Sequence, residues 1–246
     1  NADQPHVAYH DSDFGDLKYV TWGPHWELRS VHPGTNSQEP DLALNQTSPG
    51  ISFHNLDDLP DELLYAAWDG TDWAAQTLQT SSNSTAHTAL RYDAAGLPHV
   101  AAITALDRSL TYRRWDGTAW QTELVEEITT GDFGHEIQLL LDDADFPIII
   151  YTHNDSGQRR LRLAWWDGTS WQFSTNNQSP TLGSTYELAA GRLPGSNRVY
   201  VSYYDMSGGD LRLATWDGAG WSDELVDDGS GADTGRFPAI AIDAGL

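Results

Sequence analysis

The side chains in this sequence that could bind a metal ion or catalyse a reaction are mainly imidazoles and carboxylates. Such groups hold divalent metal ions such as zinc, manganese or calcium, and they also serve in general acid–base catalysis. Five of the nine histidines are candidates for such a role, namely His10, His54, His87, His135 and His153. Further candidates lie close to these histidines once the repeats described below are aligned. They are Glu39, Glu136 and Arg236, and also Asp11, Asn55, Tyr204 and Asp205. Whether these side chains can act together depends on the elements that carry them.

The composition excludes several other chemistries. The 246 residues include no cysteine, which excludes a disulfide scaffold, a cysteine-based zinc site and a thiol nucleophile. The 36 acidic residues against 13 basic ones give a net charge of -23, which repels phosphate backbones and anionic membrane surfaces. No apolar run approaches the roughly 18 to 20 residues of a membrane span. We therefore expect no nucleic-acid partner and no membrane insertion. The single lysine among thirteen cations is typical of secreted or salt-adapted proteins, and we expect a secreted, extracellular protein.

A repeat organises the whole chain. Pairs of tryptophans recur with their first members 46 to 51 residues apart, and a leucine stands five residues before each pair. Four pairs read Trp-Asp-Gly-x-x-Trp, and the first pair is shortened. The pairs are Trp22 and Trp26, Trp68 and Trp73, Trp115 and Trp120, Trp166 and Trp171, and Trp216 and Trp221, and the eleventh tryptophan, Trp165, lies outside them. This fixed period indicates five copies of one structural unit.

Each copy reads as short β-strands. Apolar and polar residues alternate in segments such as 17–22 and 211–216, and the Asp-Gly that follows most of these segments is typical of a tight hairpin. Two further apolar segments lie upstream in each copy, which makes four antiparallel strands per unit. Four-stranded units at this period are typical of propeller blades, which stack around an axis. The sequence therefore predicts an all-β, five-bladed β-propeller.

The two ends of the chain supply complementary parts of one blade. Residues 237–243 match the first strand of a unit, and residues 5–11 match the second. We therefore expect the C-terminal strand to join the N-terminal blade and close the ring, which removes exposed strand edges. The single domain 1–246 then comprises a split blade of residues 236–246 and 1–31, and further blades at about 36–78, 84–125, 134–176 and 184–226.

Three motifs resemble the repeats of a known group of proteins. Asp-Leu-Lys-Tyr-Val-x-Trp at 16–22, Val-Ser-Tyr-Tyr-Asp at 201–205 and the recurring Trp-Asp-Gly-x-x-Trp are similar to repeats in secreted bacterial and archaeal β-propellers of the sialidase-like or Asp-box-like group. The resemblance covers the whole chain and implies the fold. It implies little about function, because such repeats accompany adhesion, sugar-binding and other proteins alike.

Residues found in every copy and residues found in one copy have different expected roles. The tryptophan pairs and the Asp-Gly turns are expected to pack the blades and shape the hairpins. In the alternative interpretation, exposed tryptophan faces stack sugars in five equivalent pockets. A residue found in one copy can serve only a single site. The five unrepeated histidines stand where the first strand of a blade begins or the second ends, which places them at one mouth of the propeller channel.

Two functions follow from this arrangement, and the first is metal-assisted hydrolysis of an ester, phosphoester or glycan linkage at that mouth. Two or three of the five histidines hold the metal, Glu39 or Glu136 acts as the base on the bound water, and Arg236 stabilises the developing anion. The polar residues Asp11, Asn55, Tyr204 and Asp205 then contact the ligand. The alternative is a non-catalytic carbohydrate-binding or adhesion propeller with repeated sites between blades. Both hypotheses expect a small-molecule or glycan ligand and a monomeric chain.

Calcium binding in the carboxylate-rich loops 11–16 and 205–210 is a lesser possibility, because these loops lack the ligand spacing of an EF-hand.

Overall fold

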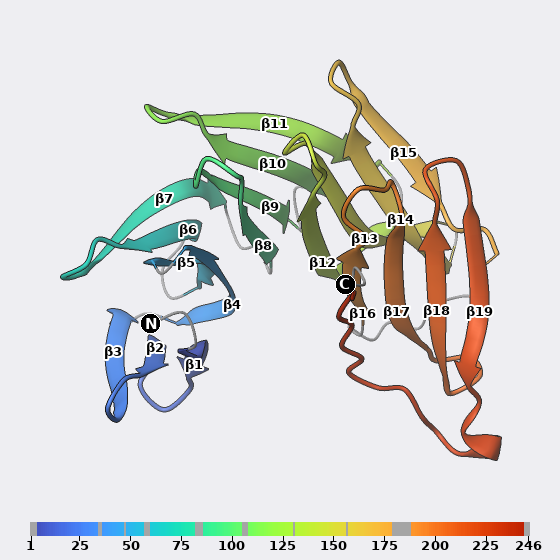
Figure 1. The fold of residues 1–246 in the computed structure, drawn as a ribbon, viewed down its shortest axis with the longest axis horizontal. Helices are drawn as coiled ribbons and strands as arrows, with labels where there is room; N and C mark the ends of the chain where they lie inside the picture. The colour runs from blue at the N-terminus through green and yellow to red at the C-terminus, as the bar shows by residue number, and fades with distance from the viewer. Residues whose placement is uncertain are drawn as a thin grey trace. The chain divides into compact units, whose positions relative to one another are not determined.

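The computed structural model describes residues 4–33, 36–46, 48–56, 60–81, 86–104, 108–129, 131–155, 157–178 and 188–243, apart from the side chains of Ala86, His135 and Asp155. These residues form strands β1 to β19 and one short 3-10 turn (Figure 1). The chain divides into two compact units, residues 1–127 and 128–246. None of the described elements is a helix long and apolar enough to cross a membrane.

The first unit contains three antiparallel sheets. The first sheet has three strands, β1 (His6–Asp11), β2 (Asp16–Trp22) and β3 (Trp26–His32). The second has four, β4 (Ser37–Asn45), β5 (Ser48–Asn55), β6 (Asp61–Trp68) and β7 (Trp73–Ser81). The third also has four, β8 (Ala86–Tyr92), β9 (Pro98–Thr104), β10 (Ser109–Trp115) and β11 (Trp120–Glu127).

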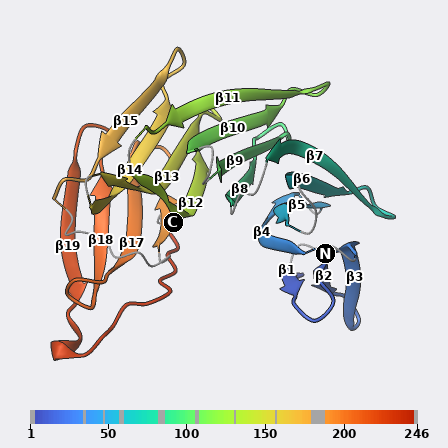
Figure 2. The ribbon, with the colours of Figure 1, turned by 180° about the vertical axis from the view of Figure 1, so that it is seen from behind.

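The second unit contains two antiparallel sheets of four strands each. One consists of β12 (Asp132–Leu141), β13 (Pro147–Asp155), β14 (Gln158–Trp166) and β15 (Trp171–Thr175). The other consists of β16 (Leu188–Arg192), β17 (Val199–Asp205), β18 (Asp210–Trp216) and β19 (Trp221–Asp227), and Figure 2 shows it from behind. In every sheet of both units the strands follow one another in chain order, which is the arrangement that the repeat predicts.

The Trp-Asp-Gly-x-x-Trp segments form the hairpins between the third and fourth strands, as predicted. In the third sheet, Asp116 Oδ1 accepts the backbone N–H groups of Thr118 and Ala119, both at 2.8 Å, so the carboxylate fixes the turn. Gly117 has a φ of 96°, a conformation that glycine adopts without steric cost. The same Asp and Gly positions recur in the other full-length hairpins. Asp-Gly is therefore an element of the fold in the four copies with a full-length hairpin.

The second tryptophan of a hairpin packs onto the preceding sheet. The Trp73 ring lies edge-on to Tyr19 at a centroid distance of 5.1 Å, and Trp120 lies edge-on to Tyr65 at 5.4 Å. In the second unit Trp221 donates its indole N–H to Ser174 Oγ at 3.0 Å. These contacts supply much apolar area between sheets. The second tryptophans of these three hairpins thus have the expected packing role, whereas Trp22 and Trp26 of the first hairpin are 42% and 53% exposed.

The core of each unit lies between neighbouring sheets. In the second unit, buried side chains of β13 and β14 meet those of β16, β17 and β18 in one cluster. The fully buried members of this cluster include Ile150, Leu161, Leu163, Val199, Val201 and Ala214. Strict alternation along each strand turns one set of side chains toward the next sheet. The sheets therefore bury their faces only by stacking, as expected of repeats that are unstable alone.

The predicted closing strand does not form in this structure. Residues 236–243 are not in a strand, and the sheet of β1, β2 and β3 has no fourth member among the described residues. Instead Ile240 and Ile242 lie against Gly191 of β16, where a Cβ atom would come within 2.7 Å of Ile242. The glycine leaves room for these two side chains. Closure of a five-bladed ring stays a prediction.

Candidate functional site

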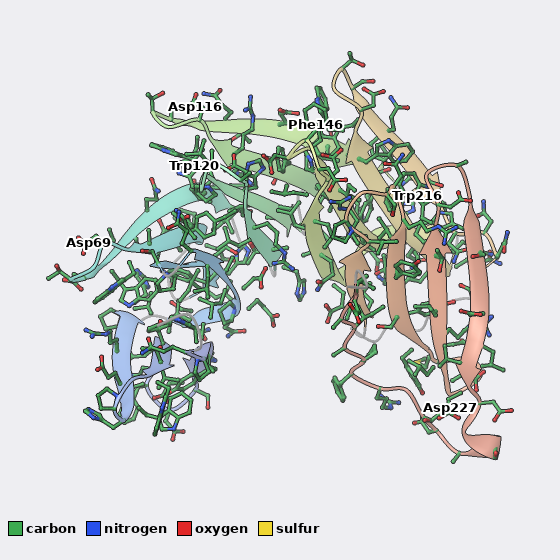
Figure 3. All side chains as sticks on the ribbon, in the orientation of Figure 1. Asp69, Asp116, Trp120, Phe146, Trp216 and Asp227 are labelled. Atoms are coloured by element: carbon green, nitrogen blue, oxygen red, sulfur yellow. The ribbon has the colours of Figure 1, made fainter. Side chains whose placement is uncertain are left out.

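A cavity of about 320 Å³ opens in the second unit between the sheet of β12–β15 and the sheet of β16–β19. Its volume lies at the lower end of the range for small-molecule sites. Figure 3 labels two of its residues, Phe146 at the turn between β12 and β13 and Trp216 at the end of β18. The lining residues are Asp142, Ala144, Phe146, Ile148, Trp165, Trp166, Asp167, Ser196, Asn197, Trp216 and Gly218.

Four aromatic side chains dominate this pocket. Trp165 on β14 and Trp216 on β18 pack together with a ring-centroid distance of 4.8 Å and an angle of 49° between the rings. Trp165 is half-buried, whereas Trp216 is only 4% exposed. Trp166 stacks edge-on against Trp171 across its own hairpin. Phe146 is 37% exposed, so the pocket has an aromatic wall with a solvent-facing edge.

The polar groups of the pocket are held by the turns. Asp142 Oδ1 accepts the backbone N–H groups of Ala144 and Phe146, both at 2.8 Å, and this fixes the turn that carries the phenylalanine. Asp167 Oδ1 accepts from the hydroxyl and the backbone N–H of Thr169 and from the backbone N–H of Ser170. These donors hold the pKa of Asp167 below its ordinary value, so it is ionised at neutral pH. The carboxylates therefore bring fixed negative charge to a pocket that also has aromatic walls.

Trp165 is the residue that distinguishes this site from the other repeats. The position before the first tryptophan of each hairpin carries Thr21, Ala67, Arg114 and Thr215 in the other copies. Its location in a pocket agrees with the rule that an unrepeated residue can serve a single site. Sequence reasoning set Trp165 aside as an extra tryptophan. The signal that it matters was its absence from the other four copies.

Three of the sequence-predicted residues come together in the first unit. His54 on β5 is only 3% exposed, and both of its ring nitrogens are buried. Burial, and secondarily the charge of His87, lower the pKa of His54 to about 3, against a smaller opposing effect of Glu39. His87 Nδ1 on β8 lies 3.5 Å from Glu39 Oε2 on β4. His54, His87 and Glu39 are thus neighbours at the contact between the second and third sheets.

Other predicted residues of the first unit have local roles. His10 pairs with Leu17 across the hairpin of β1 and β2, and its Nε2 atom is buried without a hydrogen bond. Asp11 Oδ1 accepts the backbone N–H of Asp13 at 3.2 Å, within the turn of residues 11–16. Asn55 Nδ2 donates to Glu62 Oε2 at 3.5 Å. Two of these three side chains therefore bond to residues of their own sheet.

A second group of predicted residues comes together in the other unit. The Tyr204 hydroxyl donates to Asp233 Oδ1 at 2.5 Å, and the guanidinium of Arg236 lies 4.7 Å above the Tyr204 ring. Arg236 also pairs with Asp233 at 3.2 Å. Asp205 is buried, and its Oδ1 accepts the backbone N–H and the hydroxyl of Ser207, so it shapes the turn of residues 205–210.

The remaining predicted residues are His135, Glu136 and His153. The His153 ring lies beside Phe133 at a centroid distance of 6.2 Å, and Glu136 is half-buried on β12. The side chain of His135 lies outside the described residues. Across the described side chains of both units, no group of three or more His, Asp and Glu is arranged to hold a metal ion. The predicted set is divided between the two units, so its convergence on one channel mouth stays a prediction.

Comparison with known proteins gives the fold. No protein-family model matches the sequence, and no curated protein matches it. The lectin SapL1, solved in complex with alpha methyl fucoside, is 16% identical with a TM-score of 0.57, and the match covers 97% of this chain and 85% of the lectin. A mutant of AofleA from Arthrobotrys oligospora is 14% identical with a TM-score of 0.60, over 92% of this chain and 68% of that one.

The matches also include enzymes that act on glycans. The xylan beta-1,4-xylosidase of Bacillus halodurans C-125 is 11% identical with a TM-score of 0.53, over 99% of this chain and 56% of the enzyme. Together the lectins and sialidases among the matches are β-propeller proteins. The fold is propeller-like. At these identities the propeller-like fold is what the likeness shows, and the pocket has to be interpreted from its own residues.

Proposed function

We propose that this propeller-like protein binds a carbohydrate non-catalytically in the pocket of its second unit. The observation that carries the proposal is the placement of the unrepeated Trp165 in an aromatic-lined cavity of about 320 Å³. Sugar rings present apolar C–H faces that pack on aromatic rings, while their hydroxyl groups need hydrogen-bond partners. The pocket offers both kinds of contact, because its lining includes the aromatic rings of Trp165 and Phe146 and the polar side chains of Asp142, Asp167 and Asn197.

The carboxylates of the pocket favour binding over hydrolysis. Glycoside hydrolysis uses a pair of carboxyl groups, one of which carries a raised pKa so that it can donate a proton. Asp167 has the opposite character, since four donors hold it and keep its pKa low, the fourth being Gln172 Nε2 at 2.9 Å from Oδ2. Asp142 holds its turn through two backbone N–H groups. Both carboxylates are therefore suited to accept hydrogen bonds from a ligand that stays intact.

A glycan array followed by isothermal titration tests this function. We expect binding to neutral mono- or disaccharides, with fucose included among the probes, and one sugar bound per chain because Trp165 occurs once. Phe173→Ala is a matched control, since Phe173 is an exposed aromatic residue of the same unit that does not line the pocket. Binding that survives in Trp165→Thr, or several equivalent sites per chain, would contradict this placement.

The metal-assisted hydrolase remains a second candidate because of one observation in the first unit. His54 and Glu39 lie in the second copy of the repeat and His87 lies in the third, and the three are neighbours at one contact between sheets. We infer that a zinc, manganese or calcium ion at this place would need further ligands from outside these three residues. Metal analysis of the purified protein tests this directly. If the purified protein contains no bound metal, and the His54→Ala and His87→Ala variants keep full activity, the hydrolase hypothesis is wrong.

We also propose that the five sheets close into a ring through residues 237–243 pairing with β1. The proposal rests on the sequence of that segment and on the unpaired outer side of β1 among the described residues. Hydrogen exchange provides the test. If the ring closes, amides of β1 are protected, and deleting residues 236–246 makes them exchange faster. Unchanged β1 exchange after the deletion would contradict closure.

A further inference from the structure

The surroundings of the pocket carry an excess of negative charge. None of the residues that line it is cationic, and Asp142 and Asp167 line it directly. The adjoining turns add three more carboxylates, Asp143, Asp145 and Asp217. Whatever enters the pocket therefore meets carboxylates and aromatic faces.

Arg192 and Arg198 lie nearby and offset the charges of Asp143 and Asp217, which leaves Asp142 and Asp167 of the lining as the excess negative charge. The Arg192 guanidinium donates to Asp143, and it also donates to the backbone oxygens of Leu141 at 3.1 Å and Ser196 at 2.9 Å. Arg198 lies near Asp217 and contributes to lowering the pKa of that carboxyl, after the backbone N–H groups of the hairpin. Asp143 likewise has a lowered pKa, because Arg192 donates to it. Both guanidinium groups are thus balanced by carboxylates outside the lining.

A sugar that carries a carboxylate should bind weakly in this pocket. Anionic groups bind where Arg, Lys or backbone N–H groups point at them, and the lining offers no such cation. An ammonium group has the opposite preference, because it is attracted both to carboxylates and to the faces of tryptophan rings. The combination of Trp165 with Asp142 at one pocket provides both attractions.

We propose that the pocket selects its sugar by charge, preferring a sugar that carries an ammonium group, accepting neutral sugars and rejecting uronic and sialic acids. The proposal rests on the carbohydrate-binding function proposed above. The proposal adds a ligand class to that function. Among sugars of the same configuration, the one with a free amine should bind most tightly. The central residue is Asp142, because its Oδ1 atom holds the turn while no described residue donates a hydrogen bond to Oδ2.

Asp142→Asn tests the effect of the negative charge while it keeps the shape of the side chain. The amide oxygen of asparagine can accept the same two backbone N–H groups, so the turn is retained while one negative charge is lost. Asp93→Asn is the matched control. Asp93 holds the equivalent turn of the third sheet by accepting the backbone N–H of Leu97 at 2.7 Å, and it lies in the other unit.

The test is titration of the full chain with three matched series of monosaccharides. Glucose, galactose and mannose are each compared with the 2-amino sugar, the N-acetylated amine and the uronic acid of the same configuration, at pH 6 and pH 9. An amine of this kind loses its proton at about pH 8, so the preference for the amino sugar should be present at pH 6 and disappear at pH 9. The N-acetylated sugars should show no such change.

In Asp142→Asn we expect the affinity ratio of amino to neutral sugar at pH 6 to fall about fourfold, the effect of one charge about 5 Å from the ammonium group in water. Asp93→Asn should keep the ratio of the unaltered protein. If neutral sugars bind but the amino sugars bind no more tightly, or the uronic acids bind equally well, charge selection is wrong while the carbohydrate-binding function stands. If no sugar of any series binds, the proposed function fails, and the charge selection fails with it.

Discussion

Replacing Trp165 by threonine removes the pocket tryptophan that the other repeats lack. Threonine is the residue that the first and fifth copies carry at this position, so the substitution suits a β-strand and matches the repeat. In the native structure the indole packs on Trp216 with a centroid distance of 4.8 Å and adds apolar area to the core of the second unit. The variant therefore loses both a binding surface and part of the packing.

The two losses have different magnitudes. Truncating a fully buried tryptophan costs about 3 to 5 kcal/mol, and because Trp165 is half-buried we expect about 2 kcal/mol of the free energy of unfolding to be lost. Loss of an aromatic anchor from a binding site costs about 2 kcal/mol, which corresponds to an increase in Kd of roughly thirtyfold. The protein should thus stay folded while its sugar affinity falls steeply.

The assay is isothermal titration with the tightest sugar from the array, alongside thermal unfolding of each variant. Trp165→Phe, which keeps a smaller aromatic face, should fall between the unaltered protein and Trp165→Thr. Phe173→Ala should bind as the unaltered protein does. If Trp165→Thr is folded and its Kd stays within about twofold, Trp165 is not a binding surface and the interpretation of the pocket is wrong.

Three further predictions concern the fold. Because burial lowers the pKa of His54 to about 3, the unfolded chain binds more protons at this residue between about pH 3 and 6.5. His54 should therefore remove up to about 1.4 kcal/mol of stability per pH unit as the pH falls through this range, and denaturant unfolding of His54→Leu should show a shallower acid limb. An equally steep limb would contradict this. Gly50→Ala places a Cβ atom 2.1 Å from the Tyr92 hydroxyl, so calorimetry should show a lower Tm, and an unchanged Tm would rule the clash out. Gly117→Ala should cost about 1 kcal/mol because its φ is 96°, whereas Gly220→Ala, with open space and no positive φ, should be nearly neutral in the same measurement.

The strands and hairpins could be predicted from the sequence because they depend on local interactions. Alternation along a strand and the Asp-Gly turn act within a few residues, and the turn bonds of Asp116 and Asp167 are the same in both units. The packing role of the paired tryptophans was also predictable, because a residue that recurs in every copy must satisfy a need of every copy. The structure confirms it at Trp73 and Trp120.

The pocket could not be predicted in the same way. Whether Trp165 faces the next sheet or solvent depends on how β14 and β18 meet, which is set by the packing of Leu163, Val199 and their neighbours and not by local pattern. The histidine site could not be predicted from local pattern either. His54 and His87 are neighbours in the structure, but a shared channel mouth for all five histidines requires the ring to close, and closure depends on contacts between distant parts of the chain.

A crystal structure of the protein soaked with its tightest saccharide tests the central claim most directly. We expect one sugar ring per chain, stacked on Trp165 between the β12–β15 and β16–β19 sheets, with a hydroxyl or amine within hydrogen-bond distance of Asp142. A ligand bound elsewhere, with the Trp165 pocket empty at a sugar concentration well above the measured Kd, would contradict the proposed site.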